Sequence, residues 1–106
     1  MHFINSNKKY ADLSSESFFA PESMLEFIND NGGLLPEADL IAFAQKEFSN
    51  SGKSFVDIGA HIGSYTFELA NSFEHVHSFE PAQEAYNYLC SNIALKSLTP
   101  RTTTYN

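Results

Sequence analysis

The sequence contains no tryptophan, a single cysteine and few basic residues. The last two shortages exclude several classes of function. Cys90 has no second cysteine to pair with, which excludes an internal disulfide and a CxxC metal or redox motif, and fits a reducing compartment. The 6 lysines and arginines stand against 13 aspartates and glutamates and are scattered, so they form no basic patch for a phosphate backbone. We therefore expect a cytoplasmic protein that does not bind nucleic acid.

Long apolar runs are also absent. The N-terminus lacks the apolar segment of a signal peptide, and no run approaches the ~18 residues that a membrane helix needs. We therefore expect no membrane association. By contrast, 42% of the 106 residues are hydrophobic and ten of them are Phe, which is enough to build the core of one domain.

The first half of the sequence predicts a polar leader and then two helices. Residues 1–20 are rich in Ser and Asn and show no clear period, so we expect a loose leader or a loop packed on the rest. In residues 21–52, Pro21 and Pro36 stand where a first helical turn tolerates proline, and glycines follow each apolar stretch. The apolar stripe of the second helix consists of Leu40, Ile41, Ala44 and Phe48.

From residue 53 onward, strand patterns alternate with helical ones. The predicted elements are a buried strand over 54–58, a helix capped by Ser64 with Tyr65, Leu69 and Phe73 on one side, a strand within 75–81, a helix within 82–98 and a β-prone tail over 101–106. This alternation predicts an α/β domain over residues 53–106, with right-handed crossovers and a parallel sheet. Ligands of such sheets bind at the carboxyl ends of the strands.

Two well-known glycine loops fit the stretch FVDIGAHIGSYTFELA poorly. A phosphate-binding P-loop would use SGKS, residues 51–54, but Glu47 stands where its first glycine is needed, and the GKS precedes a strand instead of following one. A dinucleotide fingerprint starting at Gly59 would have His61 and Ser64 in place of two glycines. A NAD-dependent oxidoreductase is therefore the disfavoured alternative.

Two carboxylates favour a nucleoside that carries a cation and no phosphate. Asp57 lies two residues before Gly59, where its charge would repel a pyrophosphate. S-adenosylmethionine carries an ammonium and a sulfonium, and its carboxylate can use backbone N–H groups near the turn. Gly59 and Gly63 permit close approach of the backbone to a ligand. Glu80 ends the next strand, 23 residues after Asp57, and can accept both ribose hydroxyls.

With FVDIGAHIGSYT followed by HSFEPAQEAYNYLCSNIAL, the sequence resembles the FkbM-type, S-adenosylmethionine-dependent methyltransferases. Their glycine motif is close to D-x-G-A-[NH]-x-G, and their second strand ends in F-E-P before a helix that ends in N-x-x-L. The resemblance covers about residues 53–106. It implies that Glu80 holds the ribose of S-adenosyl-L-methionine and that its aminoacyl part is surrounded by Asp57, Gly59, Ala60, His61 and Gly63.

The resemblance also implies a Rossmann-like class I methyltransferase fold, present in part. Of a seven-stranded sheet ordered 3-2-1-4-5-7-6, we expect three parallel strands with flanking helices, preceded by two helices. Because the fourth strand would neighbour the first, we expect an open sheet edge and either self-association or a completing chain. The implied reaction is methyl transfer to a hydroxyl of a small molecule or sugar, with no catalytic base assigned. The alternative is a non-catalytic remnant or assembly module that retains the cofactor-binding half.

Simpler roles stand beside these. Asp57 can simply cap the turn, and Glu80 can simply end its strand. His61 is interpreted as a residue at the helix start that hydrogen-bonds the loop, with a general base as the alternative. His75 and His77 share a strand face but have no third ligand, so no metal is expected. Tyr65 is expected in the core, and Cys90 is expected to pack within its helix.

Overall fold

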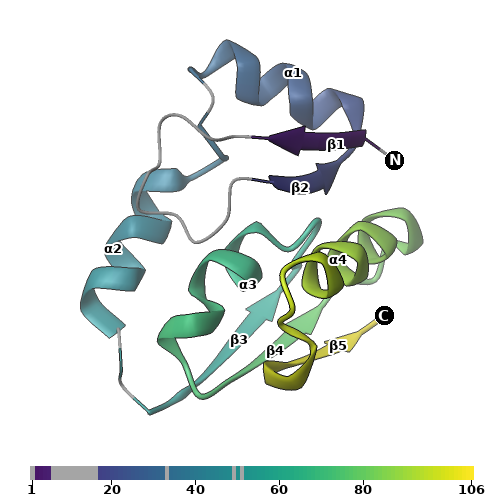
Figure 1. Cartoon of the computed structure of the whole chain (residues 1–106). Coiled ribbons are helices and arrows are strands. Elements are labelled where there is room, and N and C mark those ends of the chain that lie inside the picture. Colours follow the sequence, from purple (N-terminus) through teal and green to yellow (C-terminus); the bar gives the residue numbers. More distant parts are fainter. Residues whose placement is uncertain (1, 6–16, 33, 49, 51) are drawn as a thin grey trace.

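The N-terminal part of the chain forms two paired strands. The structure, a computed structural model, describes residues 2–5, 17–32, 34–48, 50 and 52–106; the rest of the expected leader, Gly33, Ser49 and Ser51 lie outside them. Strands β1 (His2–Asn5) and β2 (Ser17–Ala20) are antiparallel (Figure 1). The expectation of a loop is wrong for these strands. Short alternation in β2 places Phe18 and Ala20 in the core, a signal that the surrounding polar residues obscure.

Both expected helices before the parallel sheet are present. Helix α1 (Glu22–Asp30) starts after Pro21 and buries Ile28, and helix α2 (Ala38–Phe48) follows. The predicted apolar stripe of α2 is only partly correct, because Ile41 is its one buried residue among those described. The large apolar side chains of α2 that stay exposed are Leu40, Phe43 and Phe48. In the described part of the chain, none of the helices is long and apolar enough to cross a membrane.

Three parallel strands in the order β3-β4-β5 follow, as predicted (Figure 1). Hydrogen bonds from the helices to residues of one sheet face place both helices over that face. The arrangement is a partial Rossmann-like fold. Its elements are β3 (Ser54–Ile58), α3 (Ser64–Leu69), the 3-10 turn Ala70–Ser72, β4 (His75–Phe79), α4 (Gln83–Leu95), the 3-10 turn Thr99–Arg101 and β5 (Thr102–Tyr105).

Helix α3 differs from the prediction at both ends. Its N-cap is Gly63, with φ 94°, so Ser64 is the first helical residue and not the cap. The helix tightens into a 3-10 turn after Leu69, and Phe73 lies in extended backbone beyond that turn. The expected helical stripe of Tyr65, Leu69 and Phe73 therefore does not form.

Strand β3 is the edge of the sheet and is not the buried strand that its composition predicts. Among the described strands, only β4 pairs with it. Of its five residues only Asp57 is buried, whereas Val56 and Ile58 are 53% and 75% exposed. The register places these two apolar side chains on the face opposite α3 and α4. Among the described residues, β3 therefore has one side without a paired strand, and Val56 and Ile58 are exposed on the sheet face beside it.

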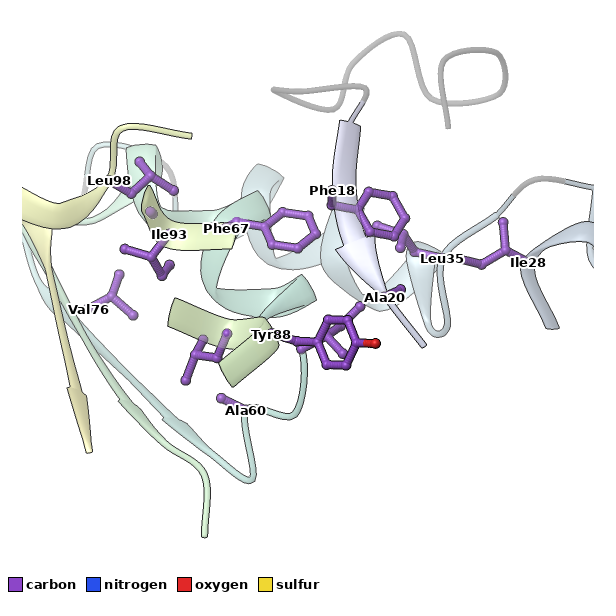
Figure 2. Packing of buried hydrophobic residues seen from close by; sticks show 13 residues of the cluster. Phe18, Ala20, Ile28, Leu35, Ala60, Phe67, Val76, Tyr88, Ile93 and Leu98 are labelled. Carbon is purple, nitrogen blue, oxygen red and sulfur yellow. The ribbon is translucent and has the colours of Figure 1, made fainter. Parts of the chain in front are cut away.

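A single core joins β2, α3, α4 and the covered face of the sheet (Figure 2). The rings of Phe18 and Phe67 lie 5.6 Å apart between centroids and connect β2 to α3. Near the end of α4, Ile93 is buried and Leu95 is exposed. The buried members of the core are Phe18, Ala20, Ile28, Leu35, Ala60, Ile62, Phe67, Ala70, Val76, Tyr88, Leu89, Ile93 and Leu98.

Candidate functional site

The glycine turn between β3 and α3 is held in an uncommon backbone conformation. Gly59, His61 and Gly63 all have positive φ values, 74°, 56° and 94°. The N–H groups of Gly59 and Ala60 both donate to the carbonyl of Phe79, each at 2.9 Å, which ties the turn to the end of β4. Three left-handed residues within five positions require a surrounding structure that enforces them, as is common at ligand sites.

Glu80 helps to hold the glycine turn in this conformation. Its Oε1 accepts the N–H of His61 at 2.8 Å, and its Oε2 accepts the N–H of Ala82 at 2.9 Å. The side chain is only 7% exposed, and the backbone N–H of Glu80 donates to the carbonyl of Tyr105. The carboxylate therefore joins the glycine turn to the start of α4. Each oxygen keeps a further lone pair, so accepting ribose hydroxyls is compatible with this bracing.

The Asp57 carboxylate lies under α3, on the covered face of the sheet. The Thr66 hydroxyl donates to Oδ2 of Asp57 at 2.6 Å, and the Ser78 hydroxyl lies 2.6 Å from that of Thr66. Because the single Thr66 proton is used, Ser78 donates to Thr66. Burial raises the pKa of Asp57, hydrogen bonds from Thr66 oppose the rise, and the charge of Glu80 adds to it.

The buried Asp57 charge leads to a pH-dependent expectation. Asp57→Asn should raise the free energy of unfolding at pH 7 by about 1 kcal/mol, because the amide oxygen still accepts from Thr66 and the desolvated charge is gone. A raised pKa in the folded state means that Asp57 contributes full stability below its ordinary value of 3.8 and loses it as the pH rises through the folded-state pKa. The advantage of the variant should therefore shrink towards pH 3.

Urea unfolding measured between pH 3 and pH 7 tests this expectation. Asp39→Asn is the matched control, since Asp39 is exposed in the first turn of α2, and it should change stability by less than about 0.5 kcal/mol. An Asp57→Asn protein less stable than the wild type at pH 7 would contradict a desolvated carboxylate.

The structure brings the residues that the sequence singles out to one end of the sheet. Asp57, Gly59, Ala60, His61 and Gly63 follow one another from β3 into α3, and Glu80 reaches across from the end of β4 to hydrogen-bond this turn. That these six contact a cofactor stays a prediction.

The two glycines differ in their surroundings. A Cβ on Gly59 would meet no atom within 4 Å, whereas one on Gly63 would lie 2.7 Å from Cδ1 of Leu89. Gly59 therefore faces open space at which a ligand can approach the backbone, and Gly63 allows close packing of the turn on α4.

The N–H groups of the turn are less available than the sequence suggests. Those of Gly59 and Ala60 bond to Phe79, that of His61 to Glu80, and that of Gly63 to the Ala60 carbonyl at 2.9 Å. The carboxylate of a ligand would have to use other donors. His61 donates its backbone N–H to Glu80, and the residue is exposed to solvent.

Tyr65 connects α3 to the segment that precedes α2. The Tyr65 hydroxyl donates to Oε1 of Glu37 at 3.1 Å, which fastens the segment before α2 to α3. Burial and the neighbouring Glu37 raise the pKa of Tyr65 to about 12. The expected core role of Tyr65 is therefore wrong, because the ring is only half-buried and lies outside the core cluster. Thr66 was missed because it belongs to no acidic or glycine pattern, and Asn92 was noticed only as part of the N-x-x-L motif, without a role at the turn.

The two strand histidines have hydrogen-bonding partners on β5. Nε2 of His75 lies 2.8 Å from the Thr103 hydroxyl, and Nδ1 of His77 lies 3.0 Å from the hydroxyl of Tyr105. The described residues contain no group of three His, Cys, Asp or Glu that could hold a metal ion. Cys90 is half-buried, with its sulfur 3.8 Å from the Thr104 hydroxyl.

The parallel sheet, the glycine turn after its first strand and the acid after its second define a Rossmann-like class of protein. Among solved structures, the chain is similar to M. jannaschii TYW2 in complex with AdoMet (S-adenosylmethionine), with 27% sequence identity and a TM-score of 0.52. The match covers 83% of this chain and 34% of that one, so this chain spans about a third of that neighbour. No protein-family model and no curated protein matches the sequence.

Proposed function

We propose that this chain forms the S-adenosyl-L-methionine-binding part of a methyltransferase. The observation that carries the proposal is the Glu80 carboxylate, buried at the end of β4 and bonded to the glycine turn, so that turn and acid form one unit. The similarity to a structure solved with AdoMet supports the choice of ligand. Because the chain spans about a third of that neighbour, the activity is proposed for a whole enzyme and not for these residues alone.

The residues of the site fit this ligand in a specific way. Gly59 has open space beside its α-carbon, where the aminoacyl part or the ribose of the ligand can approach. Glu80 can accept ribose hydroxyls through its remaining lone pairs, and the negative charge of Asp57 favours the ammonium or sulfonium of the ligand. When bound, the sulfonium supplies an activated methyl group. The turn residues bind and orient it, and orientation is the main source of rate in a displacement of this kind.

The acceptor is proposed from the resemblance to FkbM-type enzymes. It is a hydroxyl of a small molecule or sugar, and the reaction is O-methylation in a cytoplasmic setting. We identify no catalytic base among the described residues. The base and the acceptor pocket would come from the part of the enzyme that faces β3 across its open edge.

A second candidate function rests on that edge. Val56 and Ile58 are exposed on β3, and an apolar edge strand is a template for another polypeptide. In this case the chain is an assembly module that keeps the Rossmann-like half-fold and contacts either a second copy or a completing chain. A folded chain without affinity for S-adenosylmethionine would favour this role over the first.

Isothermal titration calorimetry with S-adenosylmethionine, and with NAD as the control ligand, tests the first candidate. We expect saturable binding of S-adenosylmethionine alone, with an affinity in the micromolar range, about −8 kcal/mol. At 100 times the dissociation constant, the ligand should stabilise the protein by about 2.7 kcal/mol in a thermal-shift experiment.

A variant sharpens this test. Asp57→Asn should weaken binding while it raises stability, an opposition that general damage to the fold would not produce. The exposed Asp39→Asn is again the control and should bind as the wild type does. Equal binding of NAD, or no binding by a chain shown to be folded, would contradict the proposal.

A further inference from the structure

The side chain of Asn92 is buried in α4 and bonds to two segments that are distant in sequence. Its Oδ1 accepts the N–H of Phe19 in β2 at 2.6 Å, and its Nδ2 donates to the carbonyl of the same residue at 2.9 Å. The second proton of Nδ2 goes to the carbonyl of Ile62 in the glycine turn at 2.8 Å. Asn92 has no exposed surface. One amide therefore joins β2, α4 and the turn.

The bond to Ile62 lies at the centre of the turn. Ile62 stands between His61 and Gly63, both with positive φ, so its carbonyl direction depends on two unusual backbone conformations. Its side chain is buried in the core, and the N–H groups on either side of it bond to Glu80 and Ala60. Asn92 fixes the carbonyl from within while Glu80 fixes the neighbouring N–H from the strand end. Together they determine the shape of the turn at its least favoured point.

The bonds to Phe19 extend this effect to the N-terminal strands. Asn92 uses its amide as a strand would, accepting from the N–H and donating to the C=O of one residue. Phe18, the preceding residue, is fully buried against Phe67 of α3. Because removing a buried amide partner leaves donors and acceptors without compensation, the three bonds form or break largely as a unit.

We propose that Asn92 is a positioning residue for the glycine turn, and that through it the docking of β2 becomes part of the ligand-binding unit. The turn keeps its binding conformation only while the amide holds the Ile62 carbonyl and the Phe19 backbone together. The proposal concerns the shape of the turn in the free protein, and it rests on the proposed function only in naming the ligand that this shape serves.

Hydrogen exchange measured by NMR on the full chain tests the proposal. Asn92→Leu removes the amide while keeping a side chain of similar size, and Ile93→Ala is the matched control, because it removes buried apolar volume from the same helix and leaves the Asn92 amide in place. After scaling to the measured global stability, the amides of Phe19, His61 and Gly63 should exchange at least ~10-fold faster in Asn92→Leu than in Ile93→Ala. Equal scaled rates in the two variants would overturn the proposal.

A wild-type measurement decides the matter if Asn92→Leu does not fold. Both side-chain N–H protons of the buried Asn92 are donated to backbone carbonyls, so their exchange should be slowed at least ~100-fold relative to a free asparagine. Exchange at the free rate from a folded protein would show that the amide does not hold the turn.

A binding measurement separates this inference from the proposed function. For S-adenosylmethionine, Asn92→Leu should raise the dissociation constant at least ~10-fold above that of Ile93→Ala, both corrected for the folded fraction. The same dissociation constant in both variants would overturn the positioning role. If the wild type does not bind this ligand, the proposed function fails, and the exchange rates of the free protein still decide the role of Asn92.

Discussion

Replacing Gly63 with alanine is expected to lower the free energy of unfolding by about 3 kcal/mol. The new Cβ would lie 2.7 Å from Cδ1 of Leu89, a side chain that is fully buried and cannot swing into solvent. A φ of 94° adds backbone strain for any residue with a side chain. Since a domain of this size has only about 5–15 kcal/mol of stability, the loss should be visible directly in urea unfolding.

Gly59→Ala is the control for this effect. It places the same methyl group on a residue with similar backbone, φ 74°, but no atom lies within 4 Å of the added Cβ. We expect a loss of about 1 kcal/mol from strain alone. The difference between the two variants therefore measures the packing of the turn on α4. Equal losses would mean that Leu89 does not pack against the turn as described.

Glu80→Gln is expected to destabilise the protein by about 2 kcal/mol and to weaken S-adenosylmethionine binding about 100-fold. Glutamine can accept one of the two N–H groups, from His61 or Ala82, but its own NH₂ then faces the other. One of these two N–H groups loses its partner, and the side chain no longer joins the turn to the start of α4. Binding weakens further because the carboxylate no longer accepts the ribose hydroxyls.

Glu84→Gln removes the same charge from an exposed position in the first turn of α4 and serves as the control. It should leave stability within about 0.5 kcal/mol of the wild type and binding unchanged. Stability is read by urea unfolding and affinity by calorimetry. A Glu80→Gln protein of wild-type stability would contradict the bracing role, whereas normal affinity in a weakened fold would contradict the ribose role alone.

The sequence predicts the parallel half of the fold well, because its signals are local. Strands β3 and β4 have short β-branched or aromatic runs with turn residues at their ends, and α4 has a clear helical period. The same patterns place Glu80 and the glycine turn at one end of the sheet. Local patterns do not report what covers a strand, and β3 was therefore expected to be buried although Ile58 is largely exposed.

What the sequence does not predict depends on contacts between distant residues. The Thr66 hydroxyl, which donates to Asp57, and the Asn92 amide, which accepts from the N–H of Phe19, are neutral polar groups whose partners lie 9 and 73 positions away. No spacing rule connects them. The strands β1 and β2 were missed for a related reason, since Phe18 of β2 is buried against Phe67 of α3, which follows much later in the chain.

The bond between Phe19 and Asn92 also affects the order in which the elements fold while the chain is being synthesised. The residues are 73 positions apart, so β2 leaves the ribosome long before α4 exists to receive it. At about 5–20 residues per second, the N-terminal strands wait for several seconds with Phe18 uncovered. Docking of β2 must then be a late step of folding, and during that interval the nascent chain would be the form most exposed to chaperones and proteases.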